Sequence, residues 1–472
     1  MAQDAMRRVD IDSIADMRRF HFIGIGGAGM SALAHILLEE GCTVTGSDLS
    51  ESGLLRELRA LGATIHQGHA AENLGDPEAV VVSTAIHDDN PELVLAREKG
   101  IHILHRSDVN AMLLNRRKGI AVAGAHGKTT TTAMIGVVLD TCDVSPTIII
   151  GGESPDLGTN AKLGKSDYLV SEADESDGSF VKLQPHFAIV TNIEDDHLDH
   201  YGTMEKLEDA FVAFLNNVKE GGTAILCYDS EIVRKIAPRV KTPIISYGIE
   251  ENADYQAANV KAHPGGMTFT LLHKGETLGE ISLHLPGRHN VANALAAIAA
   301  GREIGLSVEA LQKGLDAFHG AKRRFQTLYK ANDVWIVDDY AHHPTEIAMT
   351  LQAAKQTKPG RLVCAFQPHR YTRTQLLADE FGVAFGEADV LILTDVYAAG
   401  EDPIPGIDGR TLVEAVKRQT GKDAIYIERI EDIAPYLEGM CEAGDLIISM
   451  GAGDIHKAGE ELAERLGGKV RD

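Results

Sequence analysis

The stretch IAVAGAHGKTTTT, residues 120–132, decides how this 472-residue chain folds. Residues 120–123 are a short apolar run typical of a buried strand, Gly124 and Gly127 then bracket a tight turn, and a helix is expected over residues 131–139. Glycine has no Cβ, so backbone N–H groups at such a turn can approach phosphate oxygens, and the start of a helix adds partial positive charge. The stretch therefore predicts a strand, a phosphate-binding loop and a helix.

Two residues that follow the turn give the loop its expected chemistry. We expect the Lys128 amine to reach the β- and γ-phosphates of a nucleotide and the Thr129 hydroxyl to bind Mg²⁺. The usual pattern has another glycine five positions before Gly127, where this chain has Val122, so the loop is a shorter variant. The alternative is an ordinary glycine-rich turn between a strand and a helix.

The composition is that of a globular protein with a strong negative charge. A chain of this length holds about three domains, and the net charge of −24 disfavours nucleic acid, whose phosphates would be repelled. The five scattered cysteines lack a C-x-x-C pair, which predicts reduced thiols rather than a disulfide framework. No apolar run approaches the length of a signal peptide or a membrane span. We expect a cytoplasmic protein, monomeric or weakly homodimeric, with no nucleic-acid or membrane partner.

A second glycine-rich turn lies near the N-terminus. Gly24, Gly26 and Gly29 form G-x-G-x-x-G between an expected strand and helix, and Asp48 lies 19 residues after Gly29, at the end of the next strand. This is the spacing of a dinucleotide fingerprint, with the acid placed for a ribose hydroxyl. Alone, the pattern predicts an NAD-dependent oxidoreductase, but the turn suits any nucleotide diphosphate.

A further buried strand, residues 79–82, ends in three small residues. Ser83, Thr84 and Ala85 can offer backbone N–H groups to a ligand, although a plain strand end is the alternative. These elements predict a small Rossmann-like domain that ends at the polar stretch 115–118.

Polar side chains follow two more expected strands. Residues 168–171 lead to Glu172 in an acidic segment, and residues 187–191 lead to a second polar segment that contains His197. The carboxyl ends of parallel strands meet at one edge of a sheet, so Thr129, Glu172 and His197 can converge to hold Mg²⁺ against ATP phosphates. A solvated acidic surface and a strand-end cap are the alternatives.

Two later segments carry candidate nucleotide contacts. Asn290 and Asn293 lie at the start of an alanine-rich helix, where they are either caps or partners of a purine edge. Arg324 lies in an expected hinge and can neutralise a transferring phosphoryl group, with a basic surface cluster as the alternative.

The C-terminal part again alternates strands and helices. Two polar loops, residues 339–346 and 367–374, follow strands and contain paired histidines and paired arginines suited to a carboxylate and a phosphate. The sequence therefore predicts an α/β protein of three domains: an N-terminal Rossmann-like domain (1–117), a central P-loop ATPase-like parallel sheet (118–322) and a C-terminal Rossmann-like α/β domain (323–472).

Taken together, the motifs resemble one family, the Mur ligases, over nearly the whole chain. The matching segments are Gly24–Gly29, GxxGKTT (124–130), EADESD (172–177), TNI…DHLD (191–199), GxHNxxN (287–293), KRRF (322–325) and DDYAHHPTE (338–346). The family consists of ATP-dependent amino-acid ligases of peptidoglycan precursor synthesis, a process of cell-wall biogenesis that underlies cell shape and cell division. The HHPTE loop and the PHRYTR loop (368–373) most resemble the branch that adds L-alanine to UDP-N-acetylmuramate.

The resemblance implies a reaction and its cofactors. The lactyl carboxylate of UDP-N-acetylmuramate attacks the γ-phosphate of ATP, and L-alanine then displaces phosphate from the acyl phosphate. ATP and Mg²⁺ are implied, with Mn²⁺ as an alternative ion. One chain thus needs two nucleotide loops, and the first would hold the UDP diphosphate rather than NAD.

The resemblance also implies site residues. ATP binding falls on Gly124, Ala125, His126, Gly127, Lys128, Thr129, Thr130, Asn290, Asn293, Arg324 and Asp339. UDP-sugar binding falls on Gly26, Gly27, Ala28, Gly29, Asp48, Ser83, Thr84 and Ala85. Amino-acid binding falls on Tyr340, His342, Arg370 and Arg373. The metal ligands are Thr129, Glu172 and His197, and the catalytic residues are Lys128, His197, Arg324 and His342.

One departure separates this chain from relatives that add later amino acids. Those relatives place a carbamylated lysine after the DH motif to bridge a second Mg²⁺, and residues 207–214 have no lysine. The sequence therefore does not establish a second metal site, unless water and substrate hold the ion. The absence of the lysine favours the alanine-adding branch. A recycling ligase that attaches a ready-made tripeptide to the same sugar nucleotide shares most of these motifs and is the nearest alternative.

Overall fold

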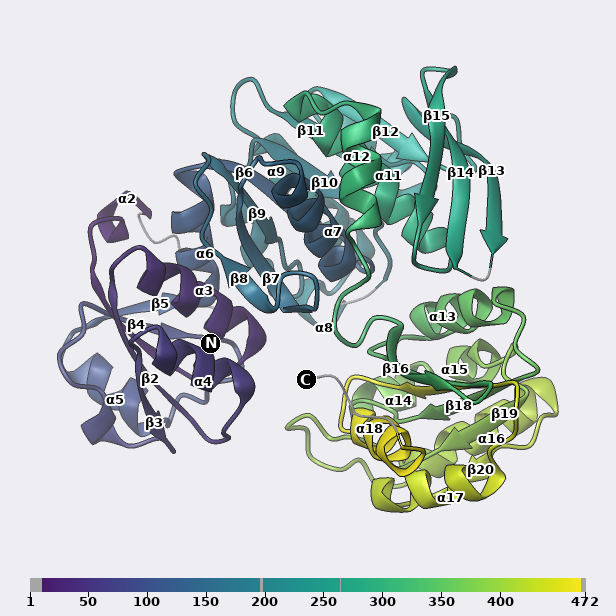
Figure 1. Ribbon diagram of the computed structural model, residues 1–472. Helices are drawn as coiled ribbons and strands as arrows, with labels where there is room; N and C mark the ends of the chain where they lie inside the picture. The colour runs from purple at the N-terminus through teal and green to yellow at the C-terminus, as the bar shows by residue number, and fades with distance from the viewer. Residues whose placement is uncertain (1–10, 196–197, 264, 468–472) are drawn as a thin grey trace. The chain divides into compact units, whose positions relative to one another are not determined.

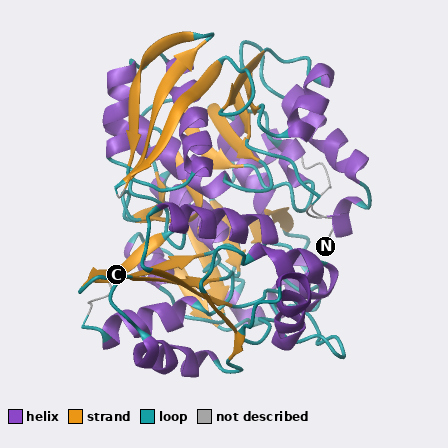
Figure 2. Cartoon of the chain, turned by 90° about the vertical axis from the view of Figure 1, so that its right-hand side faces the viewer, coloured by secondary structure: helices purple, strands orange, loops and turns teal. Residues whose placement is uncertain are grey.

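The computed structural model describes residues 11–195, 198–263 and 265–467, and the chain divides into two compact units. The first unit comprises Met1–Asn259, Phe269–Ser282 and Val291–His319, and the second comprises Val260–Thr268, Leu283–Asn290 and Gly320–Asp472. Helices flank the strands in both (Figures 1 and 2). Among the described residues, no helix has the length and apolar character needed to cross a membrane.

The first sheet of the first unit has five strands in the order β3-β2-β1-β4-β5, and every neighbouring pair is parallel. Helices connect successive strands, as parallel pairing requires. The strand order reverses between β1 and β4, which is where ligands bind in sheets of this type. The strands are β1 (Arg19–Ile23), β2 (Thr43–Asp48), β3 (Thr64–Gln67), β4 (Ala79–Val82) and β5 (His102–His105). The helices are α2 (Ile11–Ile14), α3 (Ala28–Glu39), α4 (Gly53–Ala60), α5 (Pro91–Glu98) and α6 (Arg106–Asn115).

The second sheet has ten strands in the order β15-β14-β13-β12-β11-β10-β6-β9-β7-β8. Strand β6 lies between β9 and β10 and is parallel to both, so the loops after these three strands leave the same edge. The strands are β6 (Lys118–Ala123), β7 (Thr147–Ser154), β8 (Thr159–Lys162), β9 (Tyr168–Glu172), β10 (Phe187–Val190), β11 (Thr223–Cys227), β12 (Ile244–Gly248), β13 (Tyr255–His263), β14 (Gly266–His273) and β15 (Glu276–Leu283). The helices are α7 (Lys128–Thr141), α8 (Leu198–Tyr201), α9 (Met204–Asn216), α10 (Glu231–Ile236), α11 (Arg288–Ile304) and α12 (Val308–Asp316).

Helix α7 begins at Lys128, three residues before the predicted start at residue 131. Gly127, with φ 83°, adopts the left-handed conformation and turns the chain directly into the helix. Lys128 and Thr129 therefore stand in the first helical turn, where the backbone N–H groups have no partner within the helix.

The second unit contains a six-stranded sheet in the order β16-β17-β21-β18-β19-β20. Only β16, at one edge, pairs antiparallel. Apolar side chains cover both faces of the sheet in two clusters, as the nearly continuous apolar strands predict. The strands are β16 (Gln326–Ala331), β17 (Val334–Asp339), β18 (Arg361–Phe366), β19 (Val390–Leu393), β20 (Ile425–Tyr426) and β21 (Asp445–Met450). The helices are α13 (Pro344–Gln356), α14 (Tyr371–Leu376), α15 (Ala378–Ala384), α16 (Gly409–Thr420), α17 (Ile433–Met440) and α18 (His456–Arg465).

Candidate functional site

The phosphate-binding loop between β6 and α7 is held against the end of β10. The Thr191 hydroxyl donates to the carbonyl oxygen of His126 at 2.6 Å, and Asn192 Oδ1 accepts from the His126 backbone N–H at 2.9 Å. Gly124 has φ 132°, and a Cβ there would lie 2.2 Å from Thr191 Oγ1. Only glycine fits at this position, so close packing against the end of β10 sets the loop conformation.

Lys128 lies along the loop and pairs with the acidic segment after β9. Its Nζ donates to the Gly124 carbonyl oxygen at 2.5 Å and to Glu175 Oε1 at 2.7 Å. Burial opposes the lysine charge, but the carboxylates of Glu175 and Asp174 outweigh it and raise the pKa of Lys128. The amine is therefore a fixed cation at the base of the loop. The pairing with Glu175, which is only 2% exposed, was not predicted from the sequence.

Thr129 and Glu172 come together as predicted for a metal site. The Thr129 hydroxyl donates to Glu172 Oε2 at 3.1 Å, while Glu172 Oε1 accepts from the Gly151 backbone N–H at 2.7 Å. A hydroxyl and a carboxylate oxygen at this separation form the hard oxygen donor set that Mg²⁺ prefers, so these two residues fit the ion. The third predicted ligand, His197, lies outside the described residues.

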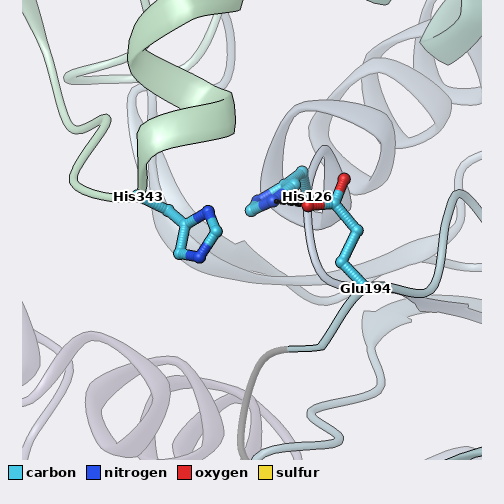
Figure 3. A group of neighbouring side chains, drawn as sticks. All are labelled: His126, Glu194 and His343. Carbon is cyan, nitrogen blue, oxygen red and sulfur yellow. Dashed lines mark hydrogen bonds and ion pairs between the residues drawn. The ribbon is translucent and has the colours of Figure 1, made fainter. Parts of the chain in front are cut away.

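The other predicted ATP contacts of the first unit surround the same loop. His126 Nε2 lies 3.2 Å from Glu194 Oε2, and Figure 3 shows the ring and the carboxylate turned toward each other. A Cβ on Gly127 would lie 2.8 Å from Asn293 Oδ1, so the Asn293 amide touches the loop and is not a distant helix cap. Thr130 is buried in α7.

The first glycine turn is built around the end of β2. Backbone N–H groups of Gly24 and Ile25 donate to the Ser47 carbonyl oxygen, and that of Gly26 donates to Asp48 Oδ2 at 2.8 Å. Asp48 thus shapes the turn with the same side chain that the sequence assigns to the sugar nucleotide. Gly27 precedes α3 without a side-chain cap.

The remaining predicted residues of this site flank the turn. Gly29 and Ala28 open α3, and residues 83–85 follow β4, the strand next to β1, so both segments leave the same edge of the sheet. A Cβ on Gly24 would meet the Ile86 side chain at 3.2 Å, which places the end of this second loop against the turn.

In the second unit, Asp339 ends β17 as a buried carboxylate. It accepts from the backbone N–H groups of Phe325 at 2.7 Å and Ala341 at 2.8 Å. Burial raises the pKa of Asp339 to about 6, although the charge of Arg324 opposes the shift. The Arg324 guanidinium lies 3.7 Å from Glu346 and over the Tyr340 ring. Arg324 and Asp339, which were each predicted to contact ATP, therefore lie in one unit, where the charge of Arg324 acts on Asp339. Asn290 also belongs to this unit and donates to the Pro286 carbonyl oxygen at 2.8 Å.

The predicted amino-acid residues gather at the ends of β17 and β18. The rings of Tyr340 and His342 lie 5.4 Å apart, and Arg373 Nη1 is 3.5 Å from His369 Nδ1. Arg370 has φ 70° and ψ 134°, a strained backbone for a non-glycine residue, and such strain concentrates at functional sites.

Two side chains of this cluster are absent from the predicted set. His369 lies 5.7 Å from the His342 ring and stacks on Tyr397, with ring centroids 5.6 Å apart. Burial lowers the pKa of His342 to about 4 and of His369 to about 3, so both imidazoles are neutral near pH 7. His369 lies in the PHRYTR loop, so the sequence motif could have identified it. Tyr397 follows a different strand, and no sequence motif surrounds it.

Three family models match this chain in sequence. The Mur ligase family catalytic domain matches residues 19–118, the Mur ligase middle domain residues 122–301, and the Mur ligase glutamate ligase domain residues 323–453. A UDP-N-acetylmuramate–L-alanine ligase of Pelotomaculum thermopropionicum is 50% identical over 450 residues, covering 95% of this chain and 98% of the relative. The enzyme of that name from Trichlorobacter lovleyi is 48% identical, covering 96% and 99%.

Solved structures agree with the sequence relatives. The UDP-N-acetylmuramate–alanine ligase of Thermotoga maritima superposes with a TM-score of 0.81 at 31% identity, covering 95% of this chain and 99% of that one. A murein peptide ligase of Psychrobacter arcticus superposes with a TM-score of 0.71 at 27% identity, covering 96% and 99%.

Proposed function

Because this chain belongs to the Mur ligase family, and is thus an ATP-dependent ligase, we propose that it joins L-alanine to the lactyl carboxylate of UDP-N-acetylmuramate. The observation that carries the proposal is the start of α7, where Lys128 and Thr129 meet acidic residues at the end of β9, in a chain similar over 95% of its length to ligases of that name. The product would enter peptidoglycan precursor synthesis in the cytoplasm.

The proposed reaction has two steps, both controlled by charge. A lactyl carboxylate oxygen attacks the γ-phosphorus of ATP, ADP leaves, and an acyl phosphate forms. The alanine amine then attacks the acyl carbon, the nitrogen releases a proton, and phosphate leaves with the electron pair of the broken C–O bond. Two anions must meet in the first step, so fixed cations and exclusion of water supply much of the rate enhancement.

Residues of the first unit carry the phosphoryl chemistry in this proposal. Lys128 neutralises the β- and γ-phosphates, and the backbone N–H groups of the loop hold the phosphate oxygens. Thr129 and Glu172 would hold Mg²⁺, which polarises phosphoryl oxygens and offsets their charge when bound. Asn293, which touches the loop at Gly127, would bind adenine. The first glycine turn, with Asp48 and residues 83–85, would bind the UDP-sugar.

Residues of the second unit have proposed roles of their own, among them Asn290, which would bind adenine. Arg324 would bind the γ-phosphate and Asp339 would contact ATP. Arg370 and Arg373 suit the alanine carboxylate, because a guanidinium pairs with a carboxylate through two parallel hydrogen bonds. Tyr340 and the neutral imidazole of His342 would line the amino-acid pocket. We assign residues 1–117 to the UDP-sugar, 118–322 to ATP and 323–472 to the amino acid.

Two other functions are less well supported. A tripeptide-recycling ligase would use the same chemistry, but the murein peptide ligase structure superposes less well than the alanine ligase structure, with TM-scores of 0.71 and 0.81. An NAD-dependent oxidoreductase leaves the arrangement of Lys128, Thr129 and Glu172 without a role.

Phosphate release from ATP and Mg²⁺ tests the proposal. With UDP-N-acetylmuramate present, we expect L-alanine to support release and L-Ala-γ-D-Glu-meso-diaminopimelate to support little or none. Release with the tripeptide alone would identify the recycling branch. Release with neither would contradict the ligase activity. Glycine and L-serine as acceptors would measure how closely the pocket fits the methyl side chain.

A further inference from the structure

Arg106 lies beside the first glycine turn, although no motif in the sequence draws attention to it. It opens α6 immediately after β5, at the same edge of the sheet that carries the turn. A Cβ built on Gly29 would lie 3.5 Å from Arg106 Nη1, which is ordinary van der Waals contact. The guanidinium therefore lies against the first turn of α3.

Asp174 holds the guanidinium in this position. Arg106 Nη2 donates to Asp174 Oδ2 at 2.5 Å. Arg106 follows β5 of the five-stranded sheet, and Asp174 follows β9 of the ten-stranded sheet. Burial opposes the charge, but Asp174 more than compensates and raises the pKa of Arg106. The side chain of Arg106 remains 28% exposed, so the cation is fixed in position but still accessible.

A cation beside the start of α3 would strengthen the binding of a doubly charged group there. The first N–H groups of a helix have no partner within it and attract anions, and Gly27 contributes no side-chain cap. The whole chain carries a net charge of −24, so a diphosphate is attracted only where local positive charge outweighs that field. A guanidinium has five N–H donors and can serve a carboxylate and a phosphate together.

We propose that Arg106 binds the diphosphate of the UDP-sugar, across the first turn of α3, and that Asp174 is the residue that positions it. The inference rests on the proposed function only in the choice of sugar nucleotide. Asp174 is followed by Glu175, which pairs with Lys128, so neighbouring residues of one acidic segment hold the cations of both nucleotide loops.

Binding of UDP tests the assignment without any turnover. Arg106→Gln keeps most of the side-chain length and a donor for Asp174 but removes the charge. By isothermal titration, we expect UDP and UDP-N-acetylmuramate to bind about 10- to 100-fold more weakly to this variant, the loss typical of one charge-assisted hydrogen bond. Affinity for ATP should stay within about twofold, because Lys128 and its loop are unchanged. Arg106→Lys should recover part of the loss.

The matched control is Arg97→Gln in the same domain. Arg97 pairs with Asp88 at 2.7 Å, both side chains are exposed, and the substitution changes the net charge equally. It should leave UDP binding unchanged. The proposal would be overturned if Arg106→Gln bound UDP within twofold of wild type. It would also be overturned if the variant lost ATP affinity as much as UDP affinity.

Three further outcomes are distinguishable. If Arg106→Gln fails to fold, Arg106→Lys is the test variant. Its UDP affinity should fall about three- to tenfold, because lysine is a cation without the guanidinium fork. Unchanged UDP affinity in Arg106→Lys would overturn the proposal. If wild-type protein binds UDP but releases no phosphate with L-alanine, the proposed function fails while the role of Arg106 is still measured. If wild-type protein binds no UDP, the role of Arg106 is wrong whatever the ligase assay shows.

Discussion

Replacement of Gly124 by alanine should disable the phosphate loop through a steric clash. The new Cβ would lie 2.2 Å from Thr191 Oγ1, 2.8 Å from the Asn192 carbonyl oxygen and 3.0 Å from the Asn192 N atom, whereas ordinary contacts begin at 3.4 Å. Two of these three atoms belong to the backbone, so no side-chain rotation relieves the clash. The loop must instead move by about 1 Å, which is the size of misplacement that costs about 10²-fold in catalysis.

The expected loss of stability follows from the same contacts. Forcing extra atoms into a packed region costs about 1–3 kcal/mol, and alanine at φ 132° adds backbone strain. Gly158→Ala is the matched control, because Gly158 also has a positive φ, +71°, but no atom within 4 Å of the added Cβ. The difference between the two variants reports the clash together with the greater backbone strain at φ 132°. At about 2–4 °C per kcal/mol for a domain of this size, Gly124→Ala should unfold several degrees lower than Gly158→Ala.

Thermal unfolding and ATP titration of the two variants measure these effects. We expect Gly158→Ala to bind ATP like wild type and Gly124→Ala to bind it far more weakly. Equal unfolding temperatures and equal ATP affinities in the two variants would refute the argument that backbone packing sets the loop conformation.

Three other substitutions test the site. Lys128→Met should lower the rate of phosphate release by about 10²-fold or more, as expected for loss of one preorganised donor, whereas Lys206→Met, an exposed position on α9, should leave it unchanged; similar rates in the two would count against the role of Lys128. Glu172→Gln should raise the Mg²⁺ concentration for half-maximal activity by about tenfold or more, and an unchanged Mg²⁺ titration would exclude Glu172 as a ligand. Burial raises the pKa of Asp339 from 3.8 to about 6, so ionisation costs more in the folded state. Wild-type protein should therefore lose stability relative to Asp339→Asn as pH rises from about 4 to about 6, in denaturant titrations, and a constant difference would contradict the shift.

Several strands and both glycine turns were predictable from the sequence because their signals are local. Runs of four apolar residues form β4, β10 and the end of β6, and glycines at fixed spacing mark the turns that follow β1 and β6. The predicted start of α7 was three residues too late. The left-handed conformation of Gly127 brings Lys128 into the helix, and the hydrophobic pattern of the sequence does not indicate this conformation. The family motifs supplied the roles that spacing alone left open.

The sequence by itself determined which residues stand at the ends of the strands, since that depends on neighbours in the chain. Only the tertiary structure decided how these residues pair. Lys128 meets Glu175 because β6 and β9 are adjacent and parallel, and Arg106 reaches both Gly29 and Asp174 because α3 and α6 contact each other and strands of the ten-stranded sheet. His369 stacks on Tyr397 across two neighbouring strands. Such contacts join residues far apart in the chain, and their geometry follows from strand order, register and packing, which no local pattern encodes.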